Sequence, residues 1–578
     1  MTPNRADVGA APEGADGWAG GRRDWWRDAV IYQVYPRSFA DSDGDGIGDL
    51  PGVTARLPYL ADLGVDGLWL SPFYRSPLAD AGYDVADYRD VDPRFGTLAD
   101  VDTLIARARE LGLHVLVDLV PNHSSDEHPW FQAALAAGPG SPERGRYLFR
   151  DGRGPHGELP PNNWRSGFGG PGWTRVTEPD GQPGQWYLHL FDVRQPDFDW
   201  TCAQVRAEFE SVLRFWLDRG VAGFRVDVAH GLIKAPGLPD VTTTADDRAV
   251  LPTHASPFWD QDGVHEVYAA WRRLLDSYGA PDRVLCAEAW VTPPERMAAY
   301  VRPGQMHQGF AFDFLGCRWD ATALRAVIDA ELRAKGAVGA PSTWVLSNHD
   351  VVRHASRLGT AEAGALSGGI RAGDPQPDPV VGLRRARAAT LLMLALPGAA
   401  YLYQGEELGL PEHTSLPDAV REDPVWIRSG HAEPGRDGCR VPLPWVADAP
   451  GFGFSPTGAT WLPQPPEFAE YAADAQAGRE HSTLELYRAA LRLRRKHQLG
   501  RGRVMWVSGE NEGEGGGGSQ HEFPETTLAF DNAELRMVVN LGTEPVAIGT
   551  DRPVVCQSGP LQTPGWLPGD TAVWLGPR

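Results

Sequence analysis

The sequence has little cysteine, no long apolar run and no export signal. Five cysteines stand at scattered positions without CxxC spacing, which favours free, buried thiols in a reducing compartment. No stretch approaches the roughly 18 apolar residues of a membrane span. The N-terminal residues lack the basic and apolar regions of a signal peptide. We therefore expect a soluble cytoplasmic protein without a membrane partner.

Positive charge is also scarce. The chain carries 54 Lys and Arg against 76 Asp and Glu, a formal net charge of −22. Because like charges repel, this balance argues against nucleic acid or anionic lipid as a partner. A neutral small-molecule substrate is compatible with it. The sequence leaves the oligomeric state open.

Strand-like runs alternate with helical patterns along most of the chain. The runs 29–35, 65–72 and 114–120 are apolar throughout, and apolar residues at helical spacing separate them. Thr97 and Asp100 form a candidate capping box before one of these helices. Such alternation predicts a parallel sheet covered on both faces, and the number of units favours a closed (β/α)8 TIM barrel. No GxGxxG follows the first strand, which weakens a nucleotide-binding interpretation.

Changes of pattern divide the chain further. A Gly-, Pro- and Trp-rich stretch after the third strand is too long for an ordinary loop, and short β-like segments follow the last helix. The predicted division is a disordered N-terminal segment at 1–24, the barrel at 25–122 and 196–498, an inserted subdomain at 123–195, and a C-terminal antiparallel β-domain at 499–578. A Gly- and Glu-rich stretch in the last domain, 510–522, is expected to be a flexible loop.

Three acidic residues occur where apolar runs give way to polar loops. They are Asp227 in GFRVDVAH, Glu288 in VLCAEAW and Asp350 in SNHDVVR. In a barrel of parallel strands, catalytic side chains gather at that face. A single carboxylate there is more often a helix cap or a surface residue, but three with the same flanking pattern indicate convergence. Cleavage of a glycosidic bond uses two such groups, one as nucleophile and one as proton donor.

Six segments, in their order along the chain, resemble the signature regions of the α-amylase superfamily of glycoside hydrolases. They are DLVPNHSS, QPDFDW, GFRVDVAH, AEAW, SNHD and GRDGCRVPLPW. The second and the last have the form found in the oligo-1,6-glucosidase and α-glucosidase branch. Any one segment would be weak evidence, but six in the correct order are specific. The resemblance extends over nearly the whole chain from about residue 25 and implies the TIM barrel predicted above.

The resemblance assigns roles to the three acids. Asp227 matches the nucleophile, Glu288 the general acid/base and Asp350 the residue that stabilises the transition state. Arg225 lies two residues before Asp227 on the same strand and therefore points to the same face. A cation there would keep Asp227 ionised. Arg225 could also be a structural partner for a buried acid, and that role is compatible with the catalytic one.

The resemblance also implies a set of substrate-binding residues. His123 and His349 match histidines that hydrogen-bond sugar hydroxyls beside the scissile bond, although a lone histidine is more often structural. Phe191 and Gln195 match residues that border the glucose at the nonreducing end.

The resemblance also implies that a pair of oppositely charged side chains closes one end of the pocket. Asp80 matches an acid that grips the terminal glucose, and Tyr83 an aromatic residue that stacks under it. Arg440 is expected to pair with Asp80. A pair at this position implies attack at chain ends instead of cleavage within a chain.

The segment DSDGDGIGDL, residues 41–50, has the alternating oxygen ligands and central glycine of an EF-hand-like calcium loop. The bidentate glutamate of an EF-hand is absent, since Gly52 stands at that position, and many Asp/Gly runs are only solvated turns. The related branch has a loop that binds one calcium ion, so a structural Ca²⁺ is expected. The predicted ligands are Asp41, Asp43, Asp45, the carbonyl of Ile47, and Asp49.

The function expected from these features is an exo-acting, retaining α-glucosidase that releases terminal glucose from a small oligosaccharide or glucoside. A transglucosylase, or an enzyme that processes sucrose or trehalose, would use the same acids and differ only in the acceptor. An inactive binding or transport-associated relative would lack one or more acids. Val228 favours α-1,6 linkages in this branch, but Ala229 and His230 depart from its common pattern, so the linkage and the preferred chain length stay open.

Overall fold

The computed structural model describes most of the chain. The described residues are 22–241, 256–364, 368–507, 523–561 and 563–578. Most of the predicted disordered segment, 1–24, lies outside them, as does the predicted flexible loop, 510–522. No helix in the described ranges combines the length and apolar composition that crossing a membrane requires. All five cysteines are described and free, and three of them are buried, in accord with the thiols expected from their spacing.

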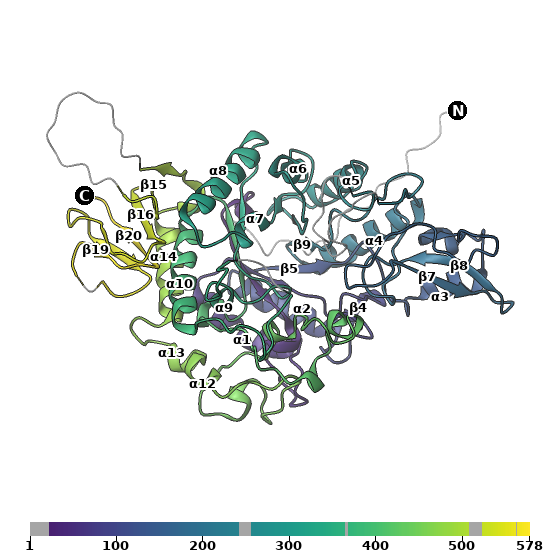
Figure 1. Cartoon of the computed structure of the whole chain (residues 1–578), viewed down its shortest axis with the longest axis horizontal. Coiled ribbons are helices and arrows are strands. Elements are labelled where there is room, and N and C mark those ends of the chain that lie inside the picture. Colours follow the sequence, from purple (N-terminus) through teal and green to yellow (C-terminus); the bar gives the residue numbers. More distant parts are fainter. Residues whose placement is uncertain (1–21, 242–255, 365–367, 508–522, 562) are drawn as a thin grey trace, which may run out of the picture.

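Eight parallel strands form the central barrel (Figure 1). Each strand pairs with its neighbours in chain order, and a parallel bridge between Phe310 and Thr343 closes the ring. The TIM barrel predicted from the sequence is therefore confirmed. The strands are β1 (Val30–Val34), β2 (Gly67–Leu70), β5 (His114–Leu119), β9 (Gly223–Val226), β10 (Val284–Ala287), β11 (Gln308–Gly309), β12 (Thr343–Val345) and β13 (Ala399–Tyr403).

Helices cover the outside of the barrel, because each has one apolar stripe to bury against the strands. One follows each strand: α1 (Leu50–Leu63), α2 (Leu98–Glu110), α4 (Ala203–Arg219), α5 (Val264–Asp276), α6 (Pro294–Ala299), α8 (Ala321–Ala337), α10 (Pro379–Ala395) and α14 (Thr483–Lys496). The capping box predicted at Thr97 and Asp100 starts α2. Short helices in the loops are α7 (Phe312–Leu315), α9 (His354–Arg357), α11 (Pro424–Arg428), α12 (Phe468–Tyr471) and α13 (Ala473–Gln476).

Two insertions lie at the carboxyl ends of the strands. The first follows β2 and contains the antiparallel pair β3 (Tyr74–Arg75) and β4 (Asp87–Val91). The second follows β5, as predicted, and forms the lobe that carries α3, β7 and β8 in Figure 1. Its elements are α3 (Pro129–Ala137), β6 (Phe149–Arg150), β7 (Trp173–Thr177) and β8 (Pro183–Leu188), with the strands ordered β6-β8-β7.

The C-terminal strands form the predicted antiparallel β-domain. One sheet has the order β14-β15-β16-β20-β18, and β17 pairs with β19. This domain packs against α10, where the Trp574 indole donates a hydrogen bond to the carbonyl of Leu391 at 3.1 Å. The strands are β14 (Met505–Trp506), β15 (Thr527–Asn532), β16 (Leu535–Asn540), β17 (Val546–Ala547), β18 (Val554–Gln557), β19 (Trp566–Leu567) and β20 (Thr571–Leu575).

Candidate active site

A cavity of about 190 Å³ opens at the carboxyl ends of the barrel strands. The three acids singled out in the sequence come together there: Asp227 follows β9, Glu288 follows β10, and Asp350 lies in the loop after β12. Of the other predicted residues, five line the same cavity, namely Asp80, Tyr83, His123, Phe191 and Arg225. The remaining three, Gln195, His349 and Arg440, do not line the cavity but contact the lining residues Asp80, Tyr83 and Asp350, respectively.

Arg225 is the central cation of this cavity. Its side chain is 2% exposed, and its Nη1 lies 2.6 Å from Oδ1 of Asp227 and 2.9 Å from Oδ1 of Asp118. Asp118 stands opposite Arg225 in the register of β5 and β9. Nη2 of Arg225 lies 3.7 Å from Oε2 of Glu288. One guanidinium therefore serves three buried carboxylates.

The peptide that follows Asp227 contacts Glu288 directly. The N–H of Val228 donates a hydrogen bond of 2.7 Å to Oε2 of Glu288. Val228 has a φ of 44°, in the left-handed region that β-branched residues rarely adopt. The contacts with Val228 and Arg225 are both made by Oε2, so among the described residues Oε1 is the oxygen left to carry a proton.

Asp227 and Glu288 share their environment and therefore titrate as a pair. Burial, together with the surrounding carboxylates, raises the pKa of Asp227 well above its usual value, although Arg225 opposes the shift. Burial likewise raises the pKa of Glu288, again against Arg225. Two raised pKa values mean that the pair keeps one proton to a higher pH than isolated carboxyls do. Arg225 lies closer to Asp227 than to Glu288 and therefore favours the charged form of Asp227 more strongly.

A second cation, Arg436, joins the opposite wall of the cavity. Its guanidinium lies 2.7 Å from Asp80, 2.8 Å from Asp350 and 2.6 Å from Asp423. The expected pairing of Arg440 with Asp80 is therefore wrong: Arg436 occupies that place, and Arg440 lies 3.0 Å from Asp350. The two arginines are four residues apart on either side of a short 3-10 turn, so the backbone path of that turn decides which one reaches Asp80.

The charge state of Asp350 differs from that of the Asp227–Glu288 pair. Burial alone would raise its pKa, but His349 and the guanidinium groups of Arg436 and Arg440 lower it below the usual range. Asp350 is therefore ionised throughout the physiological pH range. The lining of the cavity therefore combines one acid whose pKa is lowered, Asp350, with the Asp227–Glu288 pair, whose pKa values are raised.

His349 supports the floor of the cavity. Its ring stacks on Tyr83 with 5.1 Å between centroids and an angle of 8°. Its Nδ1 lies 2.7 Å from the Gln33 amide nitrogen, and its Nε2 lies 3.3 Å from Oδ2 of Asp350. Burial lowers the pKa of His349 well below the usual value, so the imidazole is neutral and Nε2 can form a hydrogen bond with a ligand.

His123 and Gln195 occupy the side that faces the inserted subdomain. The Gln195 amide nitrogen lies 3.0 Å from Oδ2 of Asp80 and 3.1 Å from Nε2 of His123. The rings of His123 and Phe191 lie 5.2 Å apart. Burial lowers the pKa of His123 to about 4, which keeps this ring neutral as well. The polar atoms on this side are thus fixed in orientation before a ligand binds.

Several residues of the site were not predicted. The additional lining residues are Phe168, Val228, His230, Trp259, Trp290 and Arg436, and Asp118 lies behind them. Five of these had a signal in the sequence. Val228 and His230 lie in GFRVDVAH, and Trp290 lies in AEAW. Arg436 lies in the same GRDGCR segment as Arg440, and Asp118 is the one charged residue of its apolar strand. Phe168 and Trp259 lie in irregular segments, where no periodicity indicates a direction for the side chain.

The acidic loop at residues 41–50 brings together three of its predicted ligands. Carboxylate oxygens of Asp41, Asp43 and Asp49 lie within 4.8 Å of one another. The N–H of Gly46 donates to Oδ2 of Asp41 at 2.8 Å, which closes the loop around the group. Asp45 does not join it; its Oδ1 accepts from the N–H of Ile47. Three converging carboxylates, two of them on buried residues, could hold a metal ion, and oxygen ligands suit a hard cation.

Known proteins match this chain over both the barrel and the candidate site. A family model described as "Alpha amylase, catalytic domain" matches residues 33–502. A probable alpha-glucosidase of Rhizobium meliloti (strain 1021) is 38% identical over 508 residues, which cover 84% of this chain and 85% of that protein.

Solved structures agree over nearly the whole length. The crystal structure of the alpha-glucosyl transfer enzyme XgtA has a TM-score of 0.79 and 34% identity, and covers 96% of this chain and 99% of that one. The crystal structure of an isomaltulose synthase mutant from Erwinia rhapontici NX5, in complex with its natural substrate sucrose, has a TM-score of 0.80 and 27% identity, and covers 96% and 99%.

The geometry around Arg436 generates a prediction about stability. We expect Arg436→Gln to lower the free energy of unfolding by about 3–5 kcal/mol at neutral pH, because it leaves three crowded carboxylates without their shared cation. The loss should shrink as the pH falls, since protonation of these carboxyls removes their repulsion. Denaturant unfolding at pH 7 and pH 5 measures both effects. The control is Arg107→Gln, which breaks an exposed pair. An equal loss in both variants, or a loss that does not change with pH, would show that Arg436 does not hold the carboxylates together.

Proposed function

Because the chain belongs to the alpha-amylase family of glycoside hydrolases, we propose that it is an exo-acting, retaining α-glucosidase. Its substrates are small oligosaccharides or glucosides with a terminal nonreducing α-linked glucose. The observation that carries the proposal is the closed wall of the cavity, where Arg436 joins Asp80 to Asp350 beside the two acids. A pocket closed at that wall accepts one terminal unit and excludes a chain that continues past it.

The first chemical step uses the charge distribution of the acid pair. The Asp227 carboxylate attacks the anomeric carbon of the glucosyl unit, and the bond to the leaving oxygen breaks as Glu288 transfers its proton to that oxygen. The products of the step are the leaving alcohol, a glucosyl ester on Asp227 and an ionised Glu288. Arg225 is already bonded to Asp227 and keeps it ionised before the attack.

In the second step Glu288 acts as a base, and Asp227 is the leaving group. Ionised Glu288 removes a proton from water, whose oxygen attacks the anomeric carbon on the face that the leaving group has vacated. The ester bond to Asp227 breaks, and the carboxylate returns to Arg225. Two displacements at one carbon restore its original configuration, so the released glucose is the α-anomer.

The other wall residues act on the sugar rather than on the reacting bond. Positive charge develops on the glucosyl ring in both transition states, and the permanent charge of Asp350 stabilises it. We assign the hydroxyls of the terminal glucose to Asp80, Asp350 and the neutral imidazoles of His123 and His349. Tyr83 offers the aromatic face for stacking under the ring.

A second candidate is transglucosylation, in which a sugar replaces water as the acceptor. The relatives described as an alpha-glucosyl transfer enzyme and an isomaltulose synthase support it. Incubation with maltose, isomaltose and sucrose, followed by separation of the products, distinguishes the two reactions. Free glucose as the main product supports hydrolysis. Oligosaccharides or sucrose isomers in excess over glucose would replace the hydrolase assignment with the transferase.

We also propose that the acidic loop binds one structural calcium ion. The group of Asp41, Asp43 and Asp49 supplies the hard, charged ligands that Ca²⁺ prefers. Asp49 is in addition the N-cap of α1, where its Oδ1 accepts from the N–H of Gly52 at 2.6 Å. An ion held there would join the loop to the first helix of the barrel. The catalytic steps above make no use of it.

Replacement of the proposed nucleophile is the first functional prediction. We expect Asp227→Asn to lower kcat for an α-glucoside by on the order of 10⁴-fold or more, because the amide cannot form the glucosyl ester. The fold should be retained, since Arg225 keeps its pair with Asp118. Circular dichroism and thermal unfolding serve as the control. A variant that folds and still hydrolyses the substrate would transfer the nucleophile role to another residue.

The raised pKa of Glu288 predicts the alkaline limb of the pH profile. We expect kcat/KM for an aryl α-glucoside to fall as the pH rises through this pKa, at a pH above that of an ordinary glutamate, because the proton needed by the leaving group is lost. Fluoride leaves without a proton, so Glu288→Gln assayed with α-glucosyl fluoride should show no such limb. The same alkaline limb in both measurements would exclude Glu288 as its source.

Removal of calcium is expected to lower the thermal unfolding temperature. Because the ion binds only the folded chain, the difference should grow with the calcium concentration. The control is Asp43→Asn, which should unfold earlier and lose its response to chelator. Thermal unfolding with and without chelator, after incubation long enough for a buried ion to exchange, measures the effect. An unchanged unfolding temperature would make the loop a plain turn.

A further inference from the structure

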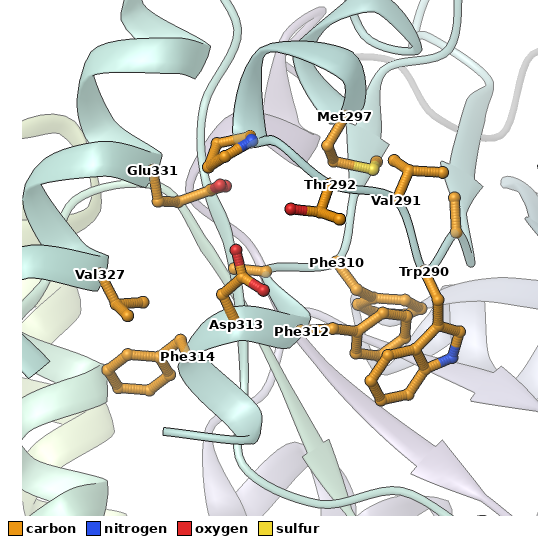
Figure 2. A pocket seen from close by; sticks show the side chains of 13 residues that line it. Trp290, Val291, Thr292, Met297, Phe310, Phe312, Asp313, Phe314, Val327 and Glu331 are labelled. Carbon is orange, nitrogen blue, oxygen red and sulfur yellow. The ribbon is translucent and has the colours of Figure 1, made fainter. Parts of the chain in front are cut away.

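Two aromatic walls of the catalytic cavity differ in how they are held. Trp290, two residues after Glu288, forms the first and stacks on Phe312 with 4.0 Å between ring centroids and an angle of 9°. Figure 2 shows these two rings packed beside Phe310, all within loops of the barrel itself. Phe168 forms the second wall and belongs to the inserted subdomain. The position of this second wall therefore depends on contacts between the subdomain and the barrel.

Phe168 lies on a tight turn, residues 166–170, shortly before β7. The N–H of Ser166 donates to the carbonyl of Gly170 at 3.1 Å and closes the turn. Gly169 and Gly170 have φ values of 96° and 80°, a left-handed conformation that glycine adopts without strain. The local sequence thus determines the shape of the turn, but a contact from outside has to fix where the turn lies.

An arginine of the barrel loops binds this turn through its backbone. Arg428, the last residue of α11, donates from Nη2 to the carbonyl of Gly169 at 2.8 Å and from Nε to the same oxygen at 3.2 Å. Its Nη1 lies 3.6 Å from Oδ2 of Asp192, a buried residue that follows β8. Because the guanidinium is a rigid planar fork, these contacts fix the turn in orientation as well as in position.

The same short helix holds the cation of the closed wall at its other end. Asp423 is the N-cap of α11, and its Oδ1 accepts from the N–H of Val425 at 2.7 Å. Its Oδ2 lies 2.6 Å from Nε of Arg436. The ring of Phe168 in turn packs 5.0 Å from the Arg436 guanidinium. One end of α11 therefore fixes this arginine, and the other end, through Arg428, fixes the turn that covers it.

We propose that Arg428 is a positioning residue of the glucosyl pocket, which holds the 166–170 turn so that Phe168 covers Arg436 and completes the closed wall. Arg428 is not among the described residues that line the cavity, so it acts on the substrate through Phe168. A ring over the guanidinium keeps water away from the ion pairs of Arg436 and strengthens them. The proposal deepens the function proposed above and rests on it, because this wall limits the pocket to one terminal unit.

The variant Arg428→Gln removes the fork and its charge. We expect it to fold like the parent, because the Arg428 side chain is partly exposed and water can replace it at the carbonyl of Gly169. The matched control is Arg27→Gln, which removes a guanidinium that donates to the carbonyl of Gly339 at 2.8 Å. Arg27 precedes β1, at the end of the barrel away from the cavity. Thermal unfolding checks both variants against the parent.

Steady-state kinetics test the route through Phe168. With an α-glucoside, Arg428→Gln should raise KM about tenfold and leave kcat within about twofold, because the wall binds the glucosyl unit in the ground state and the transition state alike. Phe168→Ala should act similarly, and adding Arg428→Gln to it should raise KM no further. Arg27→Gln should keep the parent KM. Additive effects of the two substitutions, or a fall in kcat at an unchanged KM, would overturn the proposal.

Hydrogen exchange tests the contact independently of catalysis. The N–H groups of Ser166, Gly167 and Gly169 donate within the subdomain, and in Arg428→Gln they should exchange faster, on the order of tenfold. Unchanged exchange would contradict the proposal whatever KM does, and so would faster exchange at an unchanged KM. A parent that releases no glucose from any α-glucoside would refute the proposed function. In that case the exchange rates alone still decide whether Arg428 holds the turn.

Discussion

The catalytic cavity depends on the contact between the buried guanidinium of Arg225 and the carboxylates around it. Arg225 lies 2.6 Å from Asp227, 2.9 Å from Asp118 and 3.7 Å from Glu288. An unpaired guanidinium at 2% exposure would be very costly, and so would three unpaired carboxylates. Each side therefore requires the other. Because β5, β9 and β10 bring these residues together by their parallel register, the barrel and the charge arrangement of the site stabilise each other.

Arg436 is the cation that several carboxylates share among the loops, as Arg225 is within the barrel. It joins the insertion after β2, through Asp80, to the loop after β12, through Asp350, and to Asp423 near α11. Burial acts on all these acids, but the cations are distributed unequally. Asp350 faces both Arg436 and Arg440 and has a lowered pKa, whereas Asp227 and Glu288 share Arg225 and have raised ones. The placement of three arginines thus separates a permanent anion from a pair that can hold and release a proton.

The sequence predicts the barrel and its acids because both depend on local patterns. Apolar runs fix the strands, and Asp227 and Glu288 are positioned by the strands that they follow. Contacts between loops leave no local pattern in the sequence. Arg436 and Arg440 are cations four residues apart, and only the turn between them determines which reaches Asp80. The stacking of Trp290 on a phenylalanine that follows the next strand depends likewise on a contact between two loops. Asp45 has the spacing of a metal ligand, yet its side chain bonds to its own backbone turn.

The peptide after Asp227 links the two acids through a direct contact with Glu288. Val228 has a φ of 44°, a conformation that costs on the order of 1–3 kcal/mol and persists only where its surroundings enforce it. Here the result is a 2.7 Å hydrogen bond from its N–H to Glu288. The same residue lines the cavity. A substitution at position 228 therefore changes the shape of the pocket and the position of the acid/base at the same time. For this reason, an effect of that residue on linkage preference cannot be attributed to steric fit alone; it includes the geometry of proton transfer to the leaving oxygen.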